Sequence, residues 1–460
     1  MIGVAFDILR CSRRLVERTQ KNPVVSIVRG ESVMSNCEGF NRRSFLGAVT
    51  AAGLGSSAFL ANTARAAEEL NATEAPKKFA ASYPLLQNVT ETSASISWAL
   101  NTPSTGWVEW GPTPALGKVA RNSEFGLNPF EEDFLSARIT GLAPNTTYYY
   151  RTATAAFSYR TAYDKTASET QYSDVYSFKT CGPNADEGSF FVMNDTHNTM
   201  KTIQTLLNHA KTLNPDFVLW NGDLCNFYMD SQVIKDVIAN PTNEPYAAER
   251  PLVFVPGNHD RRGAWARNLK KCLTTWEHND PNFYSLGYNY AFRQGPIAAI
   301  LLDTGEDKPD WHPAWSEMAN YEPYRELQTA WLMNALERPE IKSAPYIVAF
   351  CHIPLYDQNP KANPGNILDQ FASYQWPCAQ MWGPLFEKYG VQLAVTAHQH
   401  RFQYHAPTEE RSWAQVVGGG PEFDRAYSIY CTANSKEMKL ICTKISDMSE
   451  AGSWTFAPRG

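Results

Sequence analysis

Two different patterns of hydrophobic and polar positions follow each other along the chain. Between residues 76 and 181, short segments such as SASISWAL, TGWVEWG and DVYSFKT alternate apolar and polar side chains and end at turn residues. This alternation is typical of β-strands with one buried face, and several short strands at this spacing indicate a β-sandwich. The pattern predicts an all-β module over residues 76–181, followed by a linker in which Gly182 and Pro183 end the last strand.

The pattern changes after Gly188. Apolar runs that end in polar side chains, such as SFFVMNDTH and RPLVFVPGNHD, are separated by segments with helical periodicity, such as KTIQTLLNHAKTLN and LQTAWLMNAL. Buried strands that alternate with helices indicate an α/β domain, here over residues 188–460. Residues 305–324 and 357–382 are expected to be inserted loops beyond the strand ends, where loops select substrates.

Residues 1–67 predict an export signal rather than a part of the fold. Arg42 and Arg43 precede Ser-Phe-Leu, a segment rich in small apolar residues follows, and an A-x-A cleavage site ends at Ala66. The arrangement resembles a twin-arginine signal, for which Met34 is a more natural start than the first residue. The apolar segment is too short for a stable membrane span. We therefore expect a periplasmic or extracellular protein; the alternatives are an uncleaved anchor or a chance pair of basic residues.

The composition limits the partners. The formal net charge of -6 argues against a nucleic-acid scaffold as partner, because such a partner needs a basic face. Nine cysteines occur without a C-x-x-C pair, and seven of them follow Ala67. An exported protein could oxidise some of these seven but would keep at least one thiol free. Cys225 and Cys351 lie beside polar strand ends, where packing as small apolar side chains is the favoured interpretation.

Side chains able to bind metal collect at the ends of the predicted strands. Five of the nine histidines lie there; His398 and His400 are two residues apart, as are Asp195 and His197. Residues two apart on an extended strand point the same way, and ligands bind beyond the carboxyl ends of the strands in such sheets. Each residue alone fits a structural histidine or a cap. The set fits a metal site better, because crowded carboxylates and imidazoles need a positive charge among them.

The order of these motifs, D-x-H, G-D, G-N-H-D, H and H-x-H, resembles that of the calcineurin-like metallophosphoesterases. The preceding module is similar to a fibronectin type III domain, since residues 142–148, LAPNTTY, match a tyrosine corner in which Tyr148 hydrogen-bonds back across the turn. Together the two parts resemble the layout of purple acid phosphatases. The resemblance implies a four-layer α/β fold, a β-sandwich flanked by helices, preceded by an all-β fibronectin III-like sandwich.

The resemblance also implies two transition-metal ions, Fe, Zn or Mn, and assigns their ligands. One ion would be held by Asp195, His197 and His400. The other would be held by Asn258, His352 and His398. Asp223 would bridge both ions together with a hydroxide that attacks the phosphate ester. His259 would face the substrate, either as a proton donor or as a stabiliser of charge on the phosphoryl oxygens.

Four residues near these motifs have open roles. Asp260 either orients a metal ligand or caps the following turn. Arg261 or Arg262 either touches a phosphate or belongs to a solvated loop, and the second interpretation is favoured. Asn226 stands where purple acid phosphatases carry a metal-binding tyrosine. This departure counts against the charge-transfer colour and against a firmly held ferric ion.

Three functions fit the sequence. The first is an exported hydrolase of small phosphate monoesters. The second is a phosphodiesterase or nucleotide hydrolase with the same metals, and the third is a non-catalytic binding protein that uses the β module. Every ligand position implied by the resemblance is filled, which weighs against the third function. Of the three, we expect the first.

Overall fold

The computed structural model describes residues 78–357 and 370–459, which belong to one compact unit, Ala75–Gly460. The export signal predicted for residues 1–67 lies outside the described residues. Among the helices that the structure describes, none is both long enough and apolar enough to cross a membrane.

The all-β module is a sandwich of two antiparallel sheets, as the alternating pattern predicts. The first sheet contains β1 (Leu85–Gln87), β2 (Ser93–Ala99) and β5 (Phe134–Thr140). The strands of the second sheet are β3 (Ser104–Gly111), β4 (Lys118–Ala120), β6 (Thr147–Tyr159), β7 (Lys165–Ala167), β8 (Gln171–Tyr172) and β9 (Tyr176–Lys179). The predicted tyrosine corner is confirmed, because the backbone N–H of Ala143 donates to the hydroxyl of Tyr148 over 3.0 Å.

The first sheet of the module continues into the α/β part of the chain. Its strand β1 pairs in parallel with β12 (Leu252–Val255), so that Gln87 lies opposite Leu252. A nine-stranded sheet results, in the order β21-β20-β19-β10-β11-β12-β1-β2-β5. The other strands of this sheet are β10 (Gly188–Met193), β11 (Phe217–Asn221), β19 (Tyr427–Ala433), β20 (Met438–Lys444) and β21 (Ser449–Phe456). The two parts that differ in sequence pattern are therefore joined by backbone hydrogen bonds.

Another sheet of the α/β part has six strands, in the order β13-β14-β15-β16-β18-β17, and packs against the nine-stranded sheet. Its strands are β13 (Tyr290–Gln294), β14 (Ile297–Leu302), β15 (Tyr346–Cys351), β16 (Leu393–Thr396), β17 (Gln403–His405) and β18 (Ala414–Val417). The turn between β13 and β14 contains Gly295 with a φ of 54°, a conformation that glycine adopts without strain.

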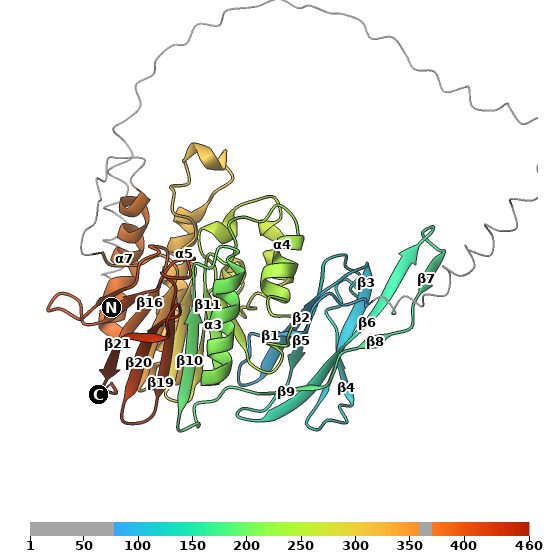
Figure 1. Ribbon diagram of the computed structural model, residues 1–460, viewed down its shortest axis with the longest axis horizontal. Helices are drawn as coiled ribbons and strands as arrows, with labels where there is room; N and C mark the ends of the chain where they lie inside the picture. Colours follow the sequence, from blue (N-terminus) through green and yellow to red (C-terminus); the bar gives the residue numbers. More distant parts are fainter. Residues whose placement is uncertain (1–77, 358–369, 460) are drawn as a thin grey trace, which may run out of the picture. The chain divides into compact units, whose positions relative to one another are not determined.

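Helices cover the outer faces of the two sheets and complete four layers (Figure 1). Between the sheets, Phe190, Phe217 and Phe350 form part of one core. On the outer side of the nine-stranded sheet, Ile203 of α3 (Met200–Leu213) packs in a second core with Phe191. On the outer side of the six-stranded sheet, Trp331 of α5 (Tyr321–Glu337) lies in a third core. The other helical segments are α4 (Gln232–Ile234), η2 (Lys235–Ala239), η3 (His259–Arg261), η4 (Ala266–Lys271), η5 (Pro281–Leu286), η6 (Pro313–Trp315), α6 (Pro339–Lys342) and α7 (Gln370–Tyr389).

The loop predicted for residues 357–382 is wrong over its second half, because α7 begins at Gln370. Pro377 and Pro384 lie inside this helix, and each removes a backbone N–H, which in a sequence signals the end of a helix. Packing overrides that signal, since Cys378 and Trp382 are buried in the third core. The prediction for residues 358–369 lies outside the described residues.

Candidate metal centre

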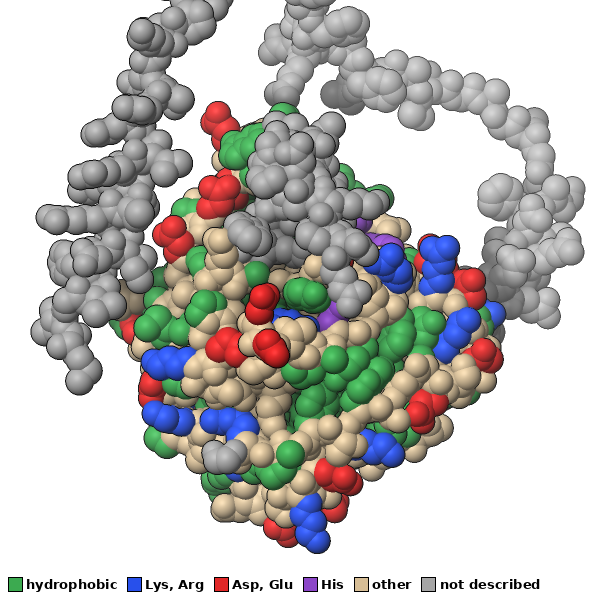
Figure 2. Space-filling model, turned by 90° about the vertical axis from the view of Figure 1, so that its left-hand side faces the viewer, with side chains coloured by type: hydrophobic (Ala, Val, Ile, Leu, Met, Phe, Trp, Pro, Cys, Tyr) green, Lys and Arg blue, Asp and Glu red, His purple; other side chains and the backbone are tan. Residues whose placement is uncertain are grey.

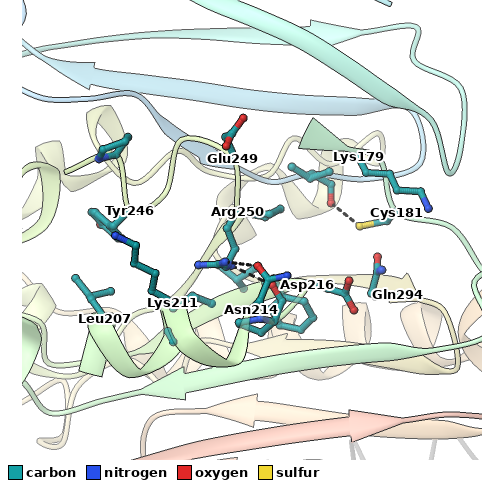
Figure 3. A pocket seen from close by; sticks show the side chains of 18 of the residues that line it. Lys179, Cys181, Leu207, Lys211, Asn214, Asp216, Tyr246, Glu249, Arg250 and Gln294 are labelled. Carbon is teal, nitrogen blue, oxygen red and sulfur yellow. Dashed lines mark hydrogen bonds between the residues drawn. The ribbon is translucent and has the colours of Figure 1, made fainter. Parts of the chain in front are cut away.

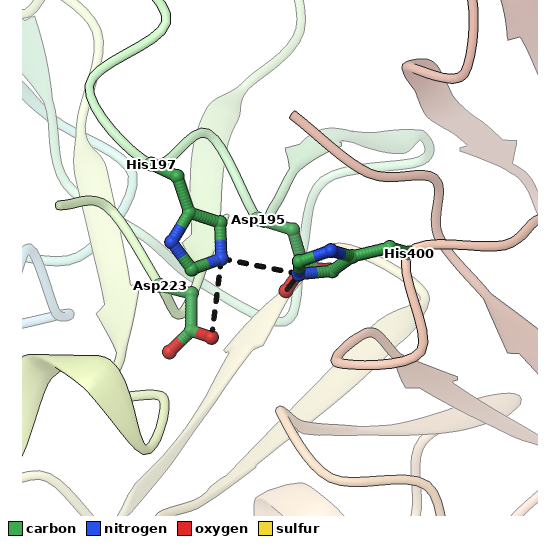
Figure 4. A group of neighbouring side chains, drawn as sticks. All are labelled: Asp195, His197, Asp223 and His400. Atoms are coloured by element: carbon green, nitrogen blue, oxygen red, sulfur yellow. Dashed lines mark hydrogen bonds and ion pairs between the residues drawn. The ribbon is translucent and has the colours of Figure 1, made fainter. Parts of the chain in front are cut away.

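The predicted ligands meet where β10, β11, β12, β15 and β16 end. Two groups of side chains have ligand atoms that all lie within 4.8 Å of one another. The first group contains Asp195, His197, Asp223 and His400 (Figure 4). The second group contains Asp223, His352 and His398. Since Asp223 belongs to both groups, the structure brings together six of the seven predicted ligands around one shared carboxylate.

The seventh predicted ligand, Asn258, belongs to the second group through its amide oxygen. This oxygen lies 2.9 Å from Nδ1 of His398. Asn258 is 1% exposed, and it directly follows Gly257 in the loop after β12. An amide oxygen and an imidazole nitrogen that face each other in this way can hold one cation between them.

Ligand atoms of the first group converge without a full set of hydrogen bonds. Nε2 of His197 lies 3.1 Å from Nε2 of His400 and 3.5 Å from Oδ2 of Asp223. Nε2 of His400 lies 3.5 Å from Oδ1 of Asp195. That same Asp195 oxygen lies 3.8 Å from Nε2 of His352, so the two groups adjoin each other.

Two buried ligand atoms of this cluster have no hydrogen-bond partner in the part of the chain that the structure describes, which is expected of atoms that bind a cation. Oδ1 of Asp195 and Nε2 of His352 are buried, and neither has a hydrogen-bond partner among the described residues. Oδ2 of Asp223 lies 3.3 Å from this His352 nitrogen, as an ion-pair neighbour. Leaving buried polar atoms unpaired costs about 1–3 kcal/mol each. Carboxylate oxygens, an amide oxygen and imidazole nitrogens suit Fe, Zn or Mn, so the residues present fit a pair of such ions.

Hydrogen bonds at the far side of two imidazoles aim them at the cluster. Nδ1 of His352 lies 2.9 Å from the carbonyl oxygen of Asn221, which can only accept, so Nδ1 carries the proton. Nδ1 of His197 lies 3.0 Å from Oδ1 of Asn226 and is oriented in the same way. Both Nε2 atoms are then left for a metal. Asn226 therefore orients His197, one of the predicted metal ligands, by hydrogen bonding.

The charges of the cluster are strongly coupled. Burial opposes a charge on His352, but Asp223 and Asp195 raise the pKa of this imidazole to about 10. Burial also opposes a charge on Asp223, yet the charge of His352 holds the pKa of the Asp223 carboxyl far below its usual range. The site is thus built for ionised carboxylates that require a positive partner.

The backbone at the site is held in an unusual conformation. Asp195, His197, Asp223, His398 and His400 have φ values of 46°, 44°, 52°, 70° and 52°. The left-handed region is rare for residues other than glycine and costs of order 1–3 kcal/mol each, so its repeated use marks a functional site. Gly222 is required next to these residues, because a Cβ there would collide with the His352 ring.

Asp260 ties two of the ligand loops together. Oδ2 of Asp260 accepts hydrogen bonds from the backbone N–H groups of Asp223 and Gly257, over 2.9 Å and 2.7 Å. Oδ1 accepts from the hydroxyl of Tyr228 over 2.6 Å. Burial and the charge of Asp223 raise the pKa of Asp260 to about 6. Of its two predicted roles, this arrangement favours the orientation of a ligand.

His259 and the two arginines after it lie in ordered contacts. The backbone N–H of His259 donates to Oδ1 of Asp223 over 2.8 Å. Arg261 pairs with Asp303 and lies over the Tyr288 ring, 5.2 Å from its centroid. Arg262 pairs with Glu306. The side chains of Arg261 and Arg262 are only 20% and 25% exposed, so the favoured interpretation of a solvated loop is wrong for both.

All seven cysteines in the described ranges, 78–357 and 370–459, are free and buried. Cys225 and Cys351 are fully buried beside the motifs, as packing residues would be. Burial raises the pKa of the Cys378 thiol to about 11, so this thiol is protonated at neutral pH.

A separate cavity of about 510 Å³ lies at the amino end of the nine-stranded sheet, opposite the end that carries the metal centre (Figure 3). Its walls come from the end of α3, from the start of β11 and from the β module, and include Lys211, Asp216 and Arg250. None of the seven predicted metal ligands lines it. The metal cluster instead opens to the surface through His400, whose side chain is 37% exposed. Histidine side chains also reach the surface on the face shown in Figure 2.

Two ligand groups around a shared carboxylate, at the strand ends of a two-sheet α/β fold, define a candidate metallophosphoesterase centre. Residues 188–402 match the family model "Calcineurin-like phosphoesterase", and residues 83–180 match "Purple acid Phosphatase, N-terminal domain". The chain therefore contains a calcineurin-like phosphoesterase domain preceded by a purple acid phosphatase N-terminal domain. The mixed α/β fold and the all-β domain in front of it, both expected from the sequence, are confirmed.

Known phosphatases are similar to about half of this chain. Purple acid phosphatase 15 of Arabidopsis thaliana is 24% identical over 249 residues, which cover 48% of this chain and 41% of that protein. Tartrate-resistant acid phosphatase type 5 of Homo sapiens is 24% identical over 239 residues, which cover 50% of this chain and 68% of that protein. The chain spans less than half the length of the two Arabidopsis relatives it matches.

Two solved structures share the fold. Purple acid phosphatase PPD1 from yellow lupin (Lupinus luteus) superposes with a TM-score of 0.58 at 16% identity, over 82% of this chain and 74% of that one. PhoD superposes with a TM-score of 0.56 at 14% identity, over 83% of this chain and 92% of that one.

Proposed function

We propose that the chain is a metal-dependent hydrolase of small phosphate monoesters. The observation that carries this proposal is the shared carboxylate of Asp223, which belongs to two adjoining groups of metal-binding side chains. A pair of bound ions would polarise the phosphoryl group and lower the pKa of a water molecule toward neutrality. The similarity to purple acid phosphatases supports the same class of reaction.

The chain's own residues would prepare the site before a substrate arrives. Asn221 and Asn226 fix the rings of His352 and His197, so that Nε2 of each faces the cluster. Asp260 fixes the backbone at Asp223, and the N–H of His259 holds one oxygen of the same carboxylate. This preorganisation places the ligands without a structural change at the time of reaction.

The proposal is tested by turnover with matched substrates. Full-length protein, reconstituted separately with Fe, Zn or Mn, would be assayed on an aryl phosphate monoester and on the corresponding diester, while elemental analysis measures bound metal. The proposal predicts turnover that requires metal and prefers the monoester. Preference for the diester would identify a phosphodiesterase instead, and metal-loaded protein without turnover on either substrate would favour a non-catalytic binding protein.

We also propose that the protein is exported by the twin-arginine pathway to the periplasm or the extracellular space. The support is the sequence around Arg42 and Arg43, which lies outside the described residues. That pathway carries folded proteins, so metal could be loaded before export. Cell fractionation after Arg42→Lys combined with Arg43→Lys tests it: retention of the precursor inside the cell is expected, and unchanged export would refute it.

A further inference from the structure

Arg262 contacts the imidazole of His259, which lies next to the metal centre but is not one of the seven predicted ligands. Its NH1 lies 2.9 Å from Nε2 of His259. On the other side of that ring, Nδ1 lies 2.8 Å from the carbonyl oxygen of Asn226. A guanidinium can only donate and a carbonyl can only accept, so Nε2 of His259 accepts and Nδ1 carries the proton. While this contact stands, His259 is neutral and has no proton to offer at Nε2.

Two buried acidic side chains, Glu306 and Asp307, hold the guanidinium in place. Nε of Arg262 donates to Oε1 of Glu306 over 2.6 Å, and NH2 donates to Oδ1 of Asp307 over 3.0 Å. The side chains of Glu306 and Asp307 are 0% and 6% exposed. Lys308 lies 2.6 Å from Asp307, so the acidic pair faces two cations. A planar guanidinium bound along one edge in this way keeps a fixed orientation.

The opposite edge of the guanidinium remains available. After the bond to His259, the second N–H of NH1 makes no hydrogen bond to any residue in the described ranges, and the side chain is 25% exposed. Arg262 adjoins the metal centre through His259, whose ring centroid lies 4.6 Å from that of His197 and whose backbone N–H donates to Asp223 over 2.8 Å. Burial lowers the pKa of Arg262, but the acidic groups of Glu306, Asp307 and Asp223 raise it by more, so the pKa lies above its usual value. This net rise agrees with the placement of Arg262 among acidic groups.

We propose that Arg262 binds a terminal oxygen of a phosphate monoester, and that His259 is the hydrogen-bond acceptor that aims it. The proposal rests on the phosphoesterase function proposed above. A monoester presents three terminal oxygens and up to two negative charges, whereas a diester presents two oxygens and one charge. An additional fixed cation with a free N–H therefore favours the monoester. Glu306 and Asp307 act as positioning residues.

A purely structural role for Arg262 is the competing explanation. Its hydrogen bonds to Glu306 and Asp307 would then serve only to satisfy two buried acidic side chains. That role predicts loss of stability on substitution and an equal effect on both kinds of substrate. A binding role predicts weaker binding of phosphate and a loss that is larger for the monoester.

The test uses metal-loaded, full-length protein and the substitutions Arg262→Ala and Arg262→Lys. Arg267→Ala is the matched control, because Arg267 is an exposed arginine on η4, in the same segment. Calorimetry would measure the affinity for inorganic phosphate, steady-state kinetics would give kcat and KM for an aryl monoester and diester, and elemental analysis would give metal content.

We expect Arg262→Ala to weaken inorganic phosphate binding and raise the monoester KM by about 10- to 100-fold, the size of a lost charge-assisted hydrogen bond. The ratio of monoester to diester kcat/KM should fall with it, at unchanged metal content. Arg262→Lys keeps the positive charge and serves as the second variant if Arg262→Ala does not fold. It should show a smaller loss of phosphate affinity and a smaller rise in the monoester KM.

Unchanged phosphate affinity in a folded, metal-loaded variant, or equal losses for monoester and diester, would overturn the proposal. The calorimetric measurement separates this outcome from failure of the proposed function. If the wild-type protein hydrolyses neither substrate, phosphate affinity still shows whether Arg262 binds the anion.

Discussion

The two ends of the nine-stranded sheet differ in whether their polar groups have hydrogen-bond partners. At the amino end, the cavity of Figure 3 has a volume of about 510 Å³, but its charged groups find partners: Arg250 donates to Asn214 over 2.6 Å, and Lys211 lies 2.8 Å from Glu244. At the carboxyl end, buried atoms of Asp195 and His352 have no hydrogen-bond partner among the described residues. The comparison teaches that unpaired buried ligand atoms indicate chemistry better than empty volume does.

The largest effect is expected from removing the shared charge. Asp223→Asn should reduce turnover by at least about 1,000-fold and lower metal content below that of the wild type, because both ligand groups lose their common carboxylate. Asp216→Asn is the matched control, since Asp216 is a carboxylate at the amino end of the same sheet and lines the cavity there. Equal loss of metal from both variants would contradict the claim that the metal site lies at the carboxyl end of the sheet.

A smaller loss of activity is expected at His259. His259→Asn should slow turnover by about 10- to 100-fold, because the imidazole that orients Arg262 is lost. Metal content should stay nearly unchanged, because the backbone N–H of His259, which the substitution keeps, makes the hydrogen bond to Asp223. His312→Asn serves as control, because the His312 side chain caps η6. Loss of metal from His259→Asn would show that this imidazole is a ligand after all.

Glu306 should make stability depend on pH. Burial raises the pKa of Glu306 from 4.5 to about 8, so the folded protein favours the neutral acid. Its contribution to stability is therefore fully present below pH 4.5 and is lost as the pH rises through about 8. The charged or titratable groups facing it are Arg262, Asp307, Lys308 and Tyr321.

The substitution Glu306→Gln removes this titration. Between pH 5 and pH 8, the free energy of unfolding should fall by a few kcal/mol more in the wild type than in the variant. Urea unfolding of metal-saturated protein at the two pH values measures the difference. Parallel curves for the two proteins would mean that Glu306 stays ionised throughout.

The smallest effect is expected at the amino end. Arg250→Ala removes hydrogen bonds to Asn214 and to the carbonyl oxygen of Pro215, and should lower the free energy of unfolding by about 1 kcal/mol. Metal content and turnover should not change, as judged by elemental analysis and by the monoester assay. A change in either would show that the two ends of the sheet are coupled.

The sequence predicted the site better than it predicted the pairing of strands. Parallel strands place their carboxyl ends at one edge, so the apolar runs before Asp195, Asp223 and Asn258 were enough to gather the ligands. The pairing of Gln87 with Leu252 joins segments far apart in the chain, and no local pattern records it.

Two features of the centre itself also depend on tertiary structure. The role of Asp260 rests on backbone N–H groups of another loop, which the sequence does not display. The alignment of Arg262 depends on Glu306, a residue of the segment expected to be an inserted loop. Ligand types can be predicted from motifs, whereas the contacts that orient them require the folded chain.

The central claim is that two metal ions share Asp223. Crystals of metal-reconstituted protein, with anomalous diffraction recorded at the absorption edge of the added metal, test it most directly. The account predicts two anomalous peaks about 3.5–4 Å apart, one on each side of the Asp223 carboxylate. A single peak, or peaks bound to other side chains in protein that is fully loaded, would contradict it.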